Sequence, residues 1–192
     1  MDVLDDKNNL SDEQLVVLSL ENHLAFSVLV DRYRDKLLNF IRKMSNLAVE
    51  DAQDVLQDVF LKVYLNLNSF DDDLKFSSWI YSITRNQIIS NYRKIKVRPE
   101  GNSIKIDETL IERLVSDFNI EKELDLKILN QQIFSVLNEL KSKWKEVLVL
   151  KFFEEKDYEE ISDIIKKPSG TVASMLNKAK KEFKEKYQEM YN

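Results

Sequence analysis

The sequence predicts an all-α protein made of two small helical domains joined by a flexible linker. Only two Gly and two Pro occur among 192 residues, so few positions favour the tight turns that β-hairpins need. Apolar residues instead recur every three or four positions along much of the chain, which is the period of an amphipathic helix. This length suffices for one ordinary domain or for two small ones.

Composition also excludes several classes of protein. The chain has no Cys and one His, which argues against a disulfide framework, a Cys-based zinc site, a thiolate nucleophile and a Ser-His hydrolase. The longest apolar runs are far shorter than the roughly 18 residues that a transmembrane helix needs. The acidic beginning of the chain is unlike a signal peptide. We therefore expect a cytoplasmic protein that binds no cofactor or metal and does not insert into a membrane.

Two long helices are predicted first. Apolar residues spaced by three and four form one stripe from Phe26 to Met44. A second helix begins near Glu50, and its buried face contains Ala52, Val55, Leu56, Val59, Val63 and Leu67. Its other side combines acids, an amide and two leucines: Asp54, Gln57, Asp58, Leu61 and Leu65. Such a mixed face indicates a protein partner, and the alternative is a helix that is buried on both sides.

A third helix starts near Ser77 and changes character along its length. Its beginning is apolar and includes Trp79, which we interpret as a core residue rather than a platform for stacking bases. Its end is polar and basic, with Arg85, Asn86, Gln87, Ser90, Asn91 and Arg93. We therefore expect the end of this helix to face a polar partner.

The second half of the chain follows a break in the pattern. Residues 97–107 contain Pro99 and Gly101 and no sustained period, which indicates a linker. Helical stripes return over residues 124–140 and 144–152. A short helix over 158–165, a turn over 166–170 and a basic helix over 171–187 then predict a helix-turn-helix. Ile161, Val172 and Leu176 would hold its two helices together.

Charge is distributed unevenly although the net charge is only −5. Residues 74–99 contain six basic residues and no acid, and residues 166–192 contain seven Lys against three Glu. Residues 100–125 between them carry eight acids and three bases. Two basic segments separated by an acidic one indicate two contacts with a polyanion. Either segment alone would be explained better as a solvated helix face.

Three motifs resemble one family. They are Asp-Ala-Gln-Asp-Val-Leu-Gln-Asp-Val-Phe at 51–60, Phe-Ser-Ser-Trp-Ile-Tyr-Ser-Ile-Thr-Arg-Asn at 76–86, and Tyr-Glu-Glu-Ile-Ser at 158–162 followed by Pro-Ser-Gly-Thr-Val at 168–172. In this order they resemble the extracytoplasmic-function sigma factors of bacterial RNA polymerase. The resemblance implies four parts: residues 1–23 as a leader with the start of the first helical region, 24–96 as a sigma-2 helical bundle, 97–122 as an acidic linker, and 123–192 as a sigma-4 helix-turn-helix domain.

The resemblance also implies roles for residues of the first domain. The mixed face of the second helix becomes the surface that docks on core polymerase, with Asp54, Gln57, Asp58, Phe60 and Leu61 as its members. Asn86 matches a position that holds a base turned out of the minus-ten element, and residues 70–75 supply the rest of that pocket. The implied minus-ten contacts are Lys75, Arg85, Asn86, Ser90, Arg93 and Lys94. Ser90 and Asn91 depart from the residues that are common in the family.

In the second domain, the resemblance implies that the final helix reads the minus-thirty-five element. The residues at reading or phosphate-binding positions are Ser169, Thr171, Ala173, Ser174, Asn177, Lys178, Lys180 and Lys181. Ala173 and Met175 stand where the family usually has a basic residue. Lys166 and Lys167 replace the usual Gly and small apolar residue of the turn, and a non-Gly residue in a left-handed turn costs about 1 kcal/mol. We therefore expect a turn that is present but either strained or different in shape.

The expected partners are core RNA polymerase, promoter DNA and an anti-sigma factor, which family members commonly have. The resemblance implies that this protein, as a sigma factor, carries no catalytic residues, because the polymerase performs the chemistry. Two other functions are compatible with parts of the sequence. A stand-alone DNA-binding regulator would use only the helix-turn-helix and would leave the first two motifs unexplained. If the protein were instead a helical interaction module, both basic segments would be only solvated helix faces.

Overall fold

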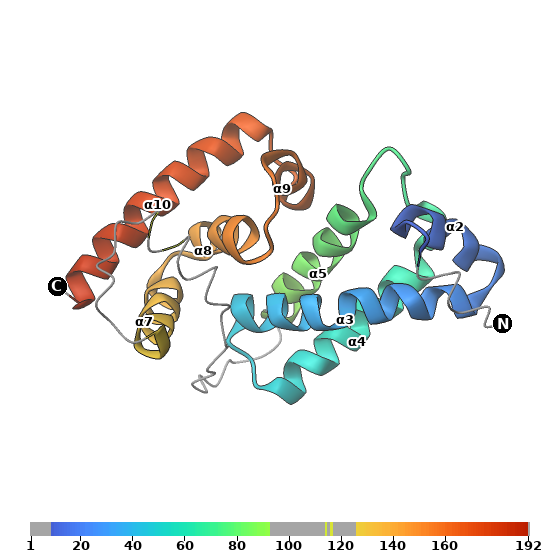
Figure 1. Ribbon diagram of the computed structural model, residues 1–192, viewed down its shortest axis with the longest axis horizontal. Helices are drawn as coiled ribbons and strands as arrows, with labels where there is room; N and C mark the ends of the chain where they lie inside the picture. Colours follow the sequence, from blue (N-terminus) through green and yellow to red (C-terminus); the bar gives the residue numbers. More distant parts are fainter. Residues whose placement is uncertain (1–8, 93–113, 115, 117–125, 192) are drawn as a thin grey trace. The chain divides into compact units, whose positions relative to one another are not determined.

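A computed structural model describes residues 9–92, 114, 116 and 126–191 of the chain, and these residues form helices and no strand. The helices are shown in chain order in Figure 1. Their contacts divide the described residues into two compact units: the first contains residues 9–92 together with Asp163–Ile165, and the second contains the others. The all-α prediction is confirmed. Among the described residues, no helix is both long enough and apolar enough to cross a membrane.

The first unit is a bundle in which α3 packs against α4 and α5. It contains α2 (Asp12–Glu21), α3 (His23–Ser45), α4 (Val49–Leu65), the short 3₁₀ helix η1 (Leu67–Ser69) and α5 (Phe76–Tyr92). The predicted stripe of α3 is confirmed, because Leu29, Leu37, Phe40 and Ile41 are fully buried. The helix ends at Ser45, and the next residue, Asn46, has a φ of 54°, a left-handed conformation that Asn tolerates.

Helix α2 lies within the segment that the sequence predicted as a leader. The Ser11 side chain accepts a hydrogen bond from the Gln14 backbone, and the Gln14 side chain accepts one from the Ser11 backbone. This reciprocal pair is a capping box, which starts a helix. Leu15 and Val16 are buried, and α2 packs against α3. The folded part of the first unit therefore includes α2, whereas residues 1–8 lie outside the described residues.

The second unit packs α7 and α8 against α10. Its elements are α7 (Leu126–Glu139), α8 (Ser142–Leu148), the π-helical turn η2 (Val149–Phe153), α9 (Tyr158–Ile165), whose last three residues are grouped with the first unit, and α10 (Ser169–Tyr191). Ile133, Leu137, Leu148 and Phe183 are buried in its core. The bounds of α9 are those that the sequence predicts, whereas α10 begins two residues earlier and ends four residues later than expected.

The linker predicted over residues 97–122 lies outside the described residues, except for residues 114 and 116. The same is true of four basic residues that follow α5 in the sequence: Arg93, Lys94, Lys96 and Arg98.

Candidate functional site

The outer face of α4 carries the mixed stripe that the sequence singled out. Ala52, Val55, Leu56, Val59 and Val63 are buried on one side of the helix. Asp54, Gln57 and Asp58 are exposed on the other side, next to Leu61 and Leu65, which are 57% and 67% exposed. A helix that is buried on both sides is therefore excluded. Two leucines in water beside carboxylates are the composition expected of a surface that binds a protein.

Asp58 also takes part in packing α4 on α5. Its Oδ2 accepts a hydrogen bond of 2.8 Å from Nε2 of Gln87, and Lys62 donates to the Oε1 atom of the same amide. Gln87 is buried, so this amide connects the two helices instead of facing an external partner. The expectation that Gln87 belongs to an outward polar end of α5 is wrong. The reason is that a polar residue can be buried when both ends of its amide have partners.

Phe60 differs from the other members of the α4 stripe because it is half-buried. Its ring packs edge-on against Phe26 of α3, with 6.5 Å between the ring centroids. Phe26 also contacts Tyr64 at 5.2 Å, and the Tyr64 hydroxyl lies 2.6 Å from Nδ1 of His23. Phe60 therefore forms part of the α3–α4 packing and borders the exposed stripe.

The segment before α5 is held by an aromatic cluster. The ring of Phe70 lies 5.8 Å from Phe76 and 5.3 Å from Trp79, and Phe76 lies 5.5 Å from Tyr33 of α3. These edge-on arrangements are the favoured geometry for aromatic pairs. Trp79 is half-buried within this cluster, which supports its interpretation as a packing residue.

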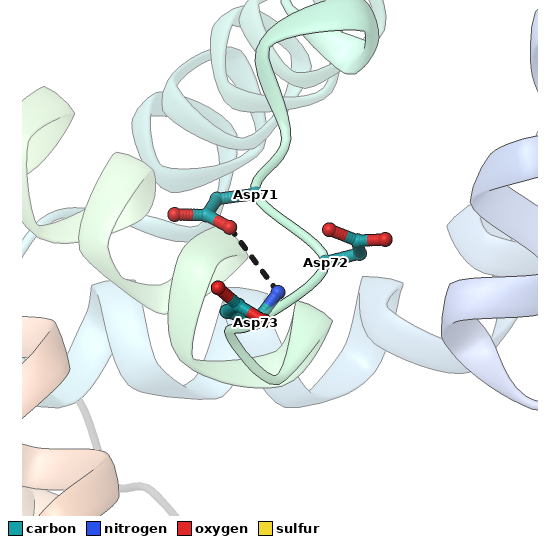
Figure 2. Close-up of side chains that lie close together, drawn as sticks. All are labelled: Asp71, Asp72 and Asp73. Carbon is teal, nitrogen blue, oxygen red and sulfur yellow. Dashed lines mark hydrogen bonds between the residues drawn. The ribbon is translucent and has the colours of Figure 1, made fainter.

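Three consecutive carboxylates follow Phe70. Asp71, Asp72 and Asp73 are exposed, and one oxygen atom from each lies within 4.8 Å of the others (Figure 2). The Asp73 amide donates a hydrogen bond of 3.2 Å to Oδ1 of Asp71, which is the contact of an Asx turn. Three exposed acids without a further feature that points to a ligand do not make a metal site, so we assign no metal here.

The polar part of α5 presents Asn86 and Ser90 to solvent. They are four residues apart, so they share one face of the helix. Arg85 is half-buried beside them, and Lys75 is exposed just before the helix begins. Arg93 and Lys94, the last two predicted minus-ten contacts, lie outside the described residues.

The start of α5 is capped from α2. The Phe76 amide donates a hydrogen bond of 3.1 Å to Oε1 of Glu13. A carboxylate in this position satisfies an amide that would lack a partner within the helix, and it complements the positive end of the helix dipole. The neighbouring Asp12 accepts hydrogen bonds from Arg32 and from the Tyr33 hydroxyl. Burial, together with this bond to Asp12, raises the pKa of Tyr33.

The helix-turn-helix has the packing that the sequence predicts. Asp157 and Glu160 form a capping box at the start of α9. Ile161, Val172 and Leu176 are buried, as expected for residues that join the two helices. Lys166 adopts the left-handed conformation at φ 55°, so the turn is strained, which is the first of the two expected forms.

The predicted reading face of α10 is exposed on one side of the helix. Its exposed members are Ser169, Thr171, Ser174, Asn177, Lys178 and Lys181, and Ala173 is half-exposed among them. The Ser174 hydroxyl donates to the Thr171 carbonyl at 2.9 Å, so its proton is used within the helix. The Lys180 side chain packs against the second unit, because its Nζ lies 5.1 Å from the centre of the Phe152 ring. This cation–π contact makes Lys180 less available for a phosphate than the exposed Lys181.

Comparisons with known proteins cover both units. Residues 29–98 match the family Sigma-70 region 2, and residues 130–183 match Sigma-70, region 4. The ECF RNA polymerase sigma factor SigW of Bacillus subtilis (strain 168) is 30% identical over an alignment of 179 residues that covers 86% of this chain and 90% of SigW. The chain belongs to the ECF sigma factors. The ECF RNA polymerase sigma-E factor of Escherichia coli (strain K12) is 29% identical over 170 residues, with coverages of 85% and 87%.

As a member of this family, the sigma factor directs RNA polymerase to promoters. Its fold is shared with two solved structures. CnrH in complex with the cytosolic domain of CnrY has a TM-score of 0.67 at 22% identity and covers 90% of this chain and 94% of its own. The sigma factor RpoE in complex with the anti-sigma factor NepR from Bartonella quintana has a TM-score of 0.63 at 22% identity, with coverages of 85% and 96%.

Several residues that shape these surfaces of the sigma factor were missed by sequence reasoning. Glu13 is separated by 63 positions from the amide that it caps, and no local pattern connects them. The Ser11 and Gln14 capping box, by contrast, was a readable signal for α2. Sequence reasoning predicted no hydrogen bond for Ser162, whose hydroxyl donates one of 2.6 Å to the Lys167 carbonyl.

Proposed function

We propose that this sigma factor uses three separate surfaces to start transcription. The outer face of α4, with Asp54, Gln57, Asp58, Leu61 and the bordering Phe60, docks on core polymerase. Residues 70–94 recognise and melt the minus-ten element, and the start of α10 reads the minus-thirty-five element. In this proposal a sigma-2 domain extends to residue 96 and includes α2, and a sigma-4 domain covers 123–192 after an acidic linker. The protein has no enzymatic step of its own and acts in the cytoplasm, where the polymerase acts.

The observation that carries this proposal is the exposure of Leu61 and Leu65 beside Asp54 and Asp58 on α4. More than half of each of these leucines lies in water, so most of its apolar surface is not buried within the first unit. Burying them against a partner removes apolar surface from water, which yields about 25 cal/mol per Å². The flanking carboxylates favour a partner that presents basic residues around an apolar centre.

Leu61→Glu tests the docking surface. Because Leu61 is exposed, the change should leave the thermal unfolding of the sigma factor nearly unchanged while reducing its affinity for core polymerase at least tenfold. Ile128→Glu is the matched control, since Ile128 is 44% exposed on α7 of the other unit. Asp54→Lys is a better charge reversal than Asp58→Lys, because the Asp58 carboxylate also holds Gln87. Equal affinity of parent and Leu61→Glu for core polymerase would refute the docking surface.

For promoter melting, we propose that Asn86 pairs with the edge of a base that has left the stack. Extruding a base costs a few kcal/mol, part of which an amide recovers by hydrogen bonding. The carboxylates of Asp71, Asp72 and Asp73 repel phosphates, so the phosphate contacts are assigned to the basic residues Lys75, Arg85, Arg93 and Lys94. Ser90 lies on the same face as Asn86.

Asn86→Ala should leave core binding intact and reduce open-complex formation on duplex promoters. A template with a bubble already open at the minus-ten element should restore most of the activity, since no base must be captured from a stack. Permanganate footprinting measures the open fraction on both templates. Equal footprints of parent and variant on duplex DNA would exclude Asn86 from the capture site.

An anti-sigma factor is proposed as a further partner. This proposal is supported by the solved complex of RpoE with the anti-sigma factor NepR, whose sigma chain shares this fold. Such an inhibitor would compete with core polymerase for the exposed face of α4. Competition that disappears in Leu61→Glu would support the assignment, whereas simultaneous binding of core polymerase and inhibitor would contradict it.

A further inference from the structure

The turn between α9 and α10 has the form of a Schellman motif but lacks the residues that are usual in one. In a Schellman motif, the residue just after the helix is left-handed and is usually Gly. An apolar contact often joins the following residue to a residue in the last turn of the helix. In this chain those three positions are Lys166, Lys167 and Ser162, so both the glycine and the apolar pair are missing.

The turn keeps the backbone hydrogen bonds of this motif and gains one more from the Ser162 hydroxyl. Lys166 is left-handed, at φ 55° and ψ 52°, and its amide donates to the Ser162 carbonyl. The Lys167 amide donates to the same carbonyl at 3.1 Å. In the opposite direction, the Ser162 hydroxyl donates to the Lys167 carbonyl at 2.6 Å. One serine therefore binds both polar groups of the Lys167 backbone.

This arrangement leads directly into α10. The carbonyl of Pro168, the next residue, accepts the first amides of the helix, from Thr171 at 2.8 Å and from Val172 at 3.0 Å. Val172 is fully buried, so the start of α10 is fixed to the unit at that side chain. The position of the Lys167–Pro168 backbone therefore sets where α10 begins.

We propose that Ser162 is a positioning residue for promoter reading: its hydroxyl holds the strained Lys166 turn closed and so fixes how α10 presents Asn177 and its neighbours to DNA. The proposal rests on the reading role of α10 given above. It assigns to the hydroxyl the function that a glycine and an apolar pair have in an ordinary turn of this type.

The two energies involved are similar in size. A left-handed Lys disfavours the closed turn by about fivefold. One hydrogen bond favours it by about two- to tenfold. Without the hydroxyl, the fraction of molecules with a closed turn falls, and the apparent affinity for DNA falls with that fraction. With glycine at position 166 the turn is closed without help, so the hydroxyl matters less.

The test compares Ser162→Ala in two backgrounds of the full chain. Lys166→Gln removes the charge and keeps the strain, whereas Lys166→Gly removes the charge and the strain. With saturating core polymerase, the readout is the ratio of open complex on a promoter selected with the parent protein to that on the same promoter with a scrambled minus-thirty-five element. We expect Ser162→Ala to lower this ratio about two- to fivefold in the Gln background. In the Gly background the loss should be clearly smaller.

Two results would overturn the role of Ser162: an unchanged ratio in the Gln background, or equal losses in both backgrounds, which is what a generally weakened unit would give. Asn177→Ala is measured in parallel to separate this proposal from the one on which it rests. If Asn177→Ala lowers the ratio and Ser162→Ala does not, only the turn proposal fails. If neither changes the ratio, the reading role of α10 fails as well.

Discussion

The two helices assigned to DNA are positioned in different ways. Helix α5 is capped by Glu13, which precedes its first amide by 63 residues, and its first turn packs in an aromatic cluster with Tyr33 and Phe70. Helix α10 follows directly from a turn that is closed by Ser162 and Lys167. The start of α5 therefore depends on contacts between distant segments, whereas the start of α10 depends in addition on the turn that immediately precedes it in the sequence.

This difference has a consequence for mutations. A substitution in α2 or α3 that alters Glu13, Asp12 or Tyr33 should alter the position of α5, although none of these residues is among the proposed DNA contacts. The turn before α10 is closed by hydrogen bonds among residues 162–167, so a change there acts directly on the first residues of α10. Variants in the first unit should therefore alter melting and stability together, and variants in the turn should alter reading more selectively.

The largest expected effect comes from removing the centre of the aromatic cluster. Phe76→Ala empties a fully buried site between α3 and α5, and such truncations cost about 3 to 5 kcal/mol of unfolding free energy. Phe183→Ala is the matched change in the second unit, because Phe183 is also buried. Hydrogen exchange should show lost protection mainly in the unit that carries the change. Loss of protection in both units with either variant would show that the units unfold together.

The next effect separates base reading from phosphate binding on α10. Asn177→Ala should reduce discrimination at one or two positions of the minus-thirty-five element by roughly 1 to 3 kcal/mol if the amide contacts an adenine. Lys181→Ala should weaken all sequences about equally and lower the salt slope by about one. The Lys181–Glu185 pair is exposed, so its loss changes stability little. Indistinguishable sequence profiles for the two variants in a promoter selection would rule out base reading by this face.

A smaller effect is expected at the cap of α5. Glu13→Ala leaves the Phe76 amide without its acceptor, which should cost about 1 to 2 kcal/mol in the first unit. Open-complex formation on duplex promoters should fall more than binding to the minus-thirty-five element. Glu13→Gln keeps an oxygen acceptor in the same place and should recover much of the loss. If Glu13→Gln is as damaging as Glu13→Ala, the contribution of Glu13 comes from its charge and not from the hydrogen bond to Phe76.

Local features of the fold could be predicted from the sequence. The bounds of α9 follow from Asp157, Glu160 and the nearby Pro168, all of which act within a few residues. The exposed stripe of α4 follows from the helical period. The left-handed conformation at Lys166 was implied by the family resemblance, because this residue stands where the family usually has Gly, and it is present.

Features that depend on tertiary contacts could not be predicted. Helix α2 has exposed Val17 and Leu20 beside buried Leu15 and Val16, so its apolar residues do not form a clean stripe. The burial of Gln87 depends on Asp58 and Lys62 of another helix. The position of Lys180 over Phe152 likewise depends on a ring that is distant in the sequence.

The smallest predicted effect distinguishes the two units by pH. Lys145 of α8 is buried, its Nζ donates to Oδ1 of Asn138 at 2.8 Å, and burial lowers its pKa to about 8. An unfolded Lys keeps its proton up to about pH 10.4, so between these values the unfolded state binds the extra proton and stability rises with pH. From pH 7 to pH 9 the second unit should gain about 1 kcal/mol. In the first unit, burial raises the pKa of Tyr33, and a group of this kind lowers stability only above about pH 10.

The chain has two Trp, one in each unit, so denaturant unfolding of Trp79→Phe and Trp144→Phe variants reports the two units separately. Lys145→Met should abolish the rise in the second unit, and a rise that persists in this variant would assign it to another group.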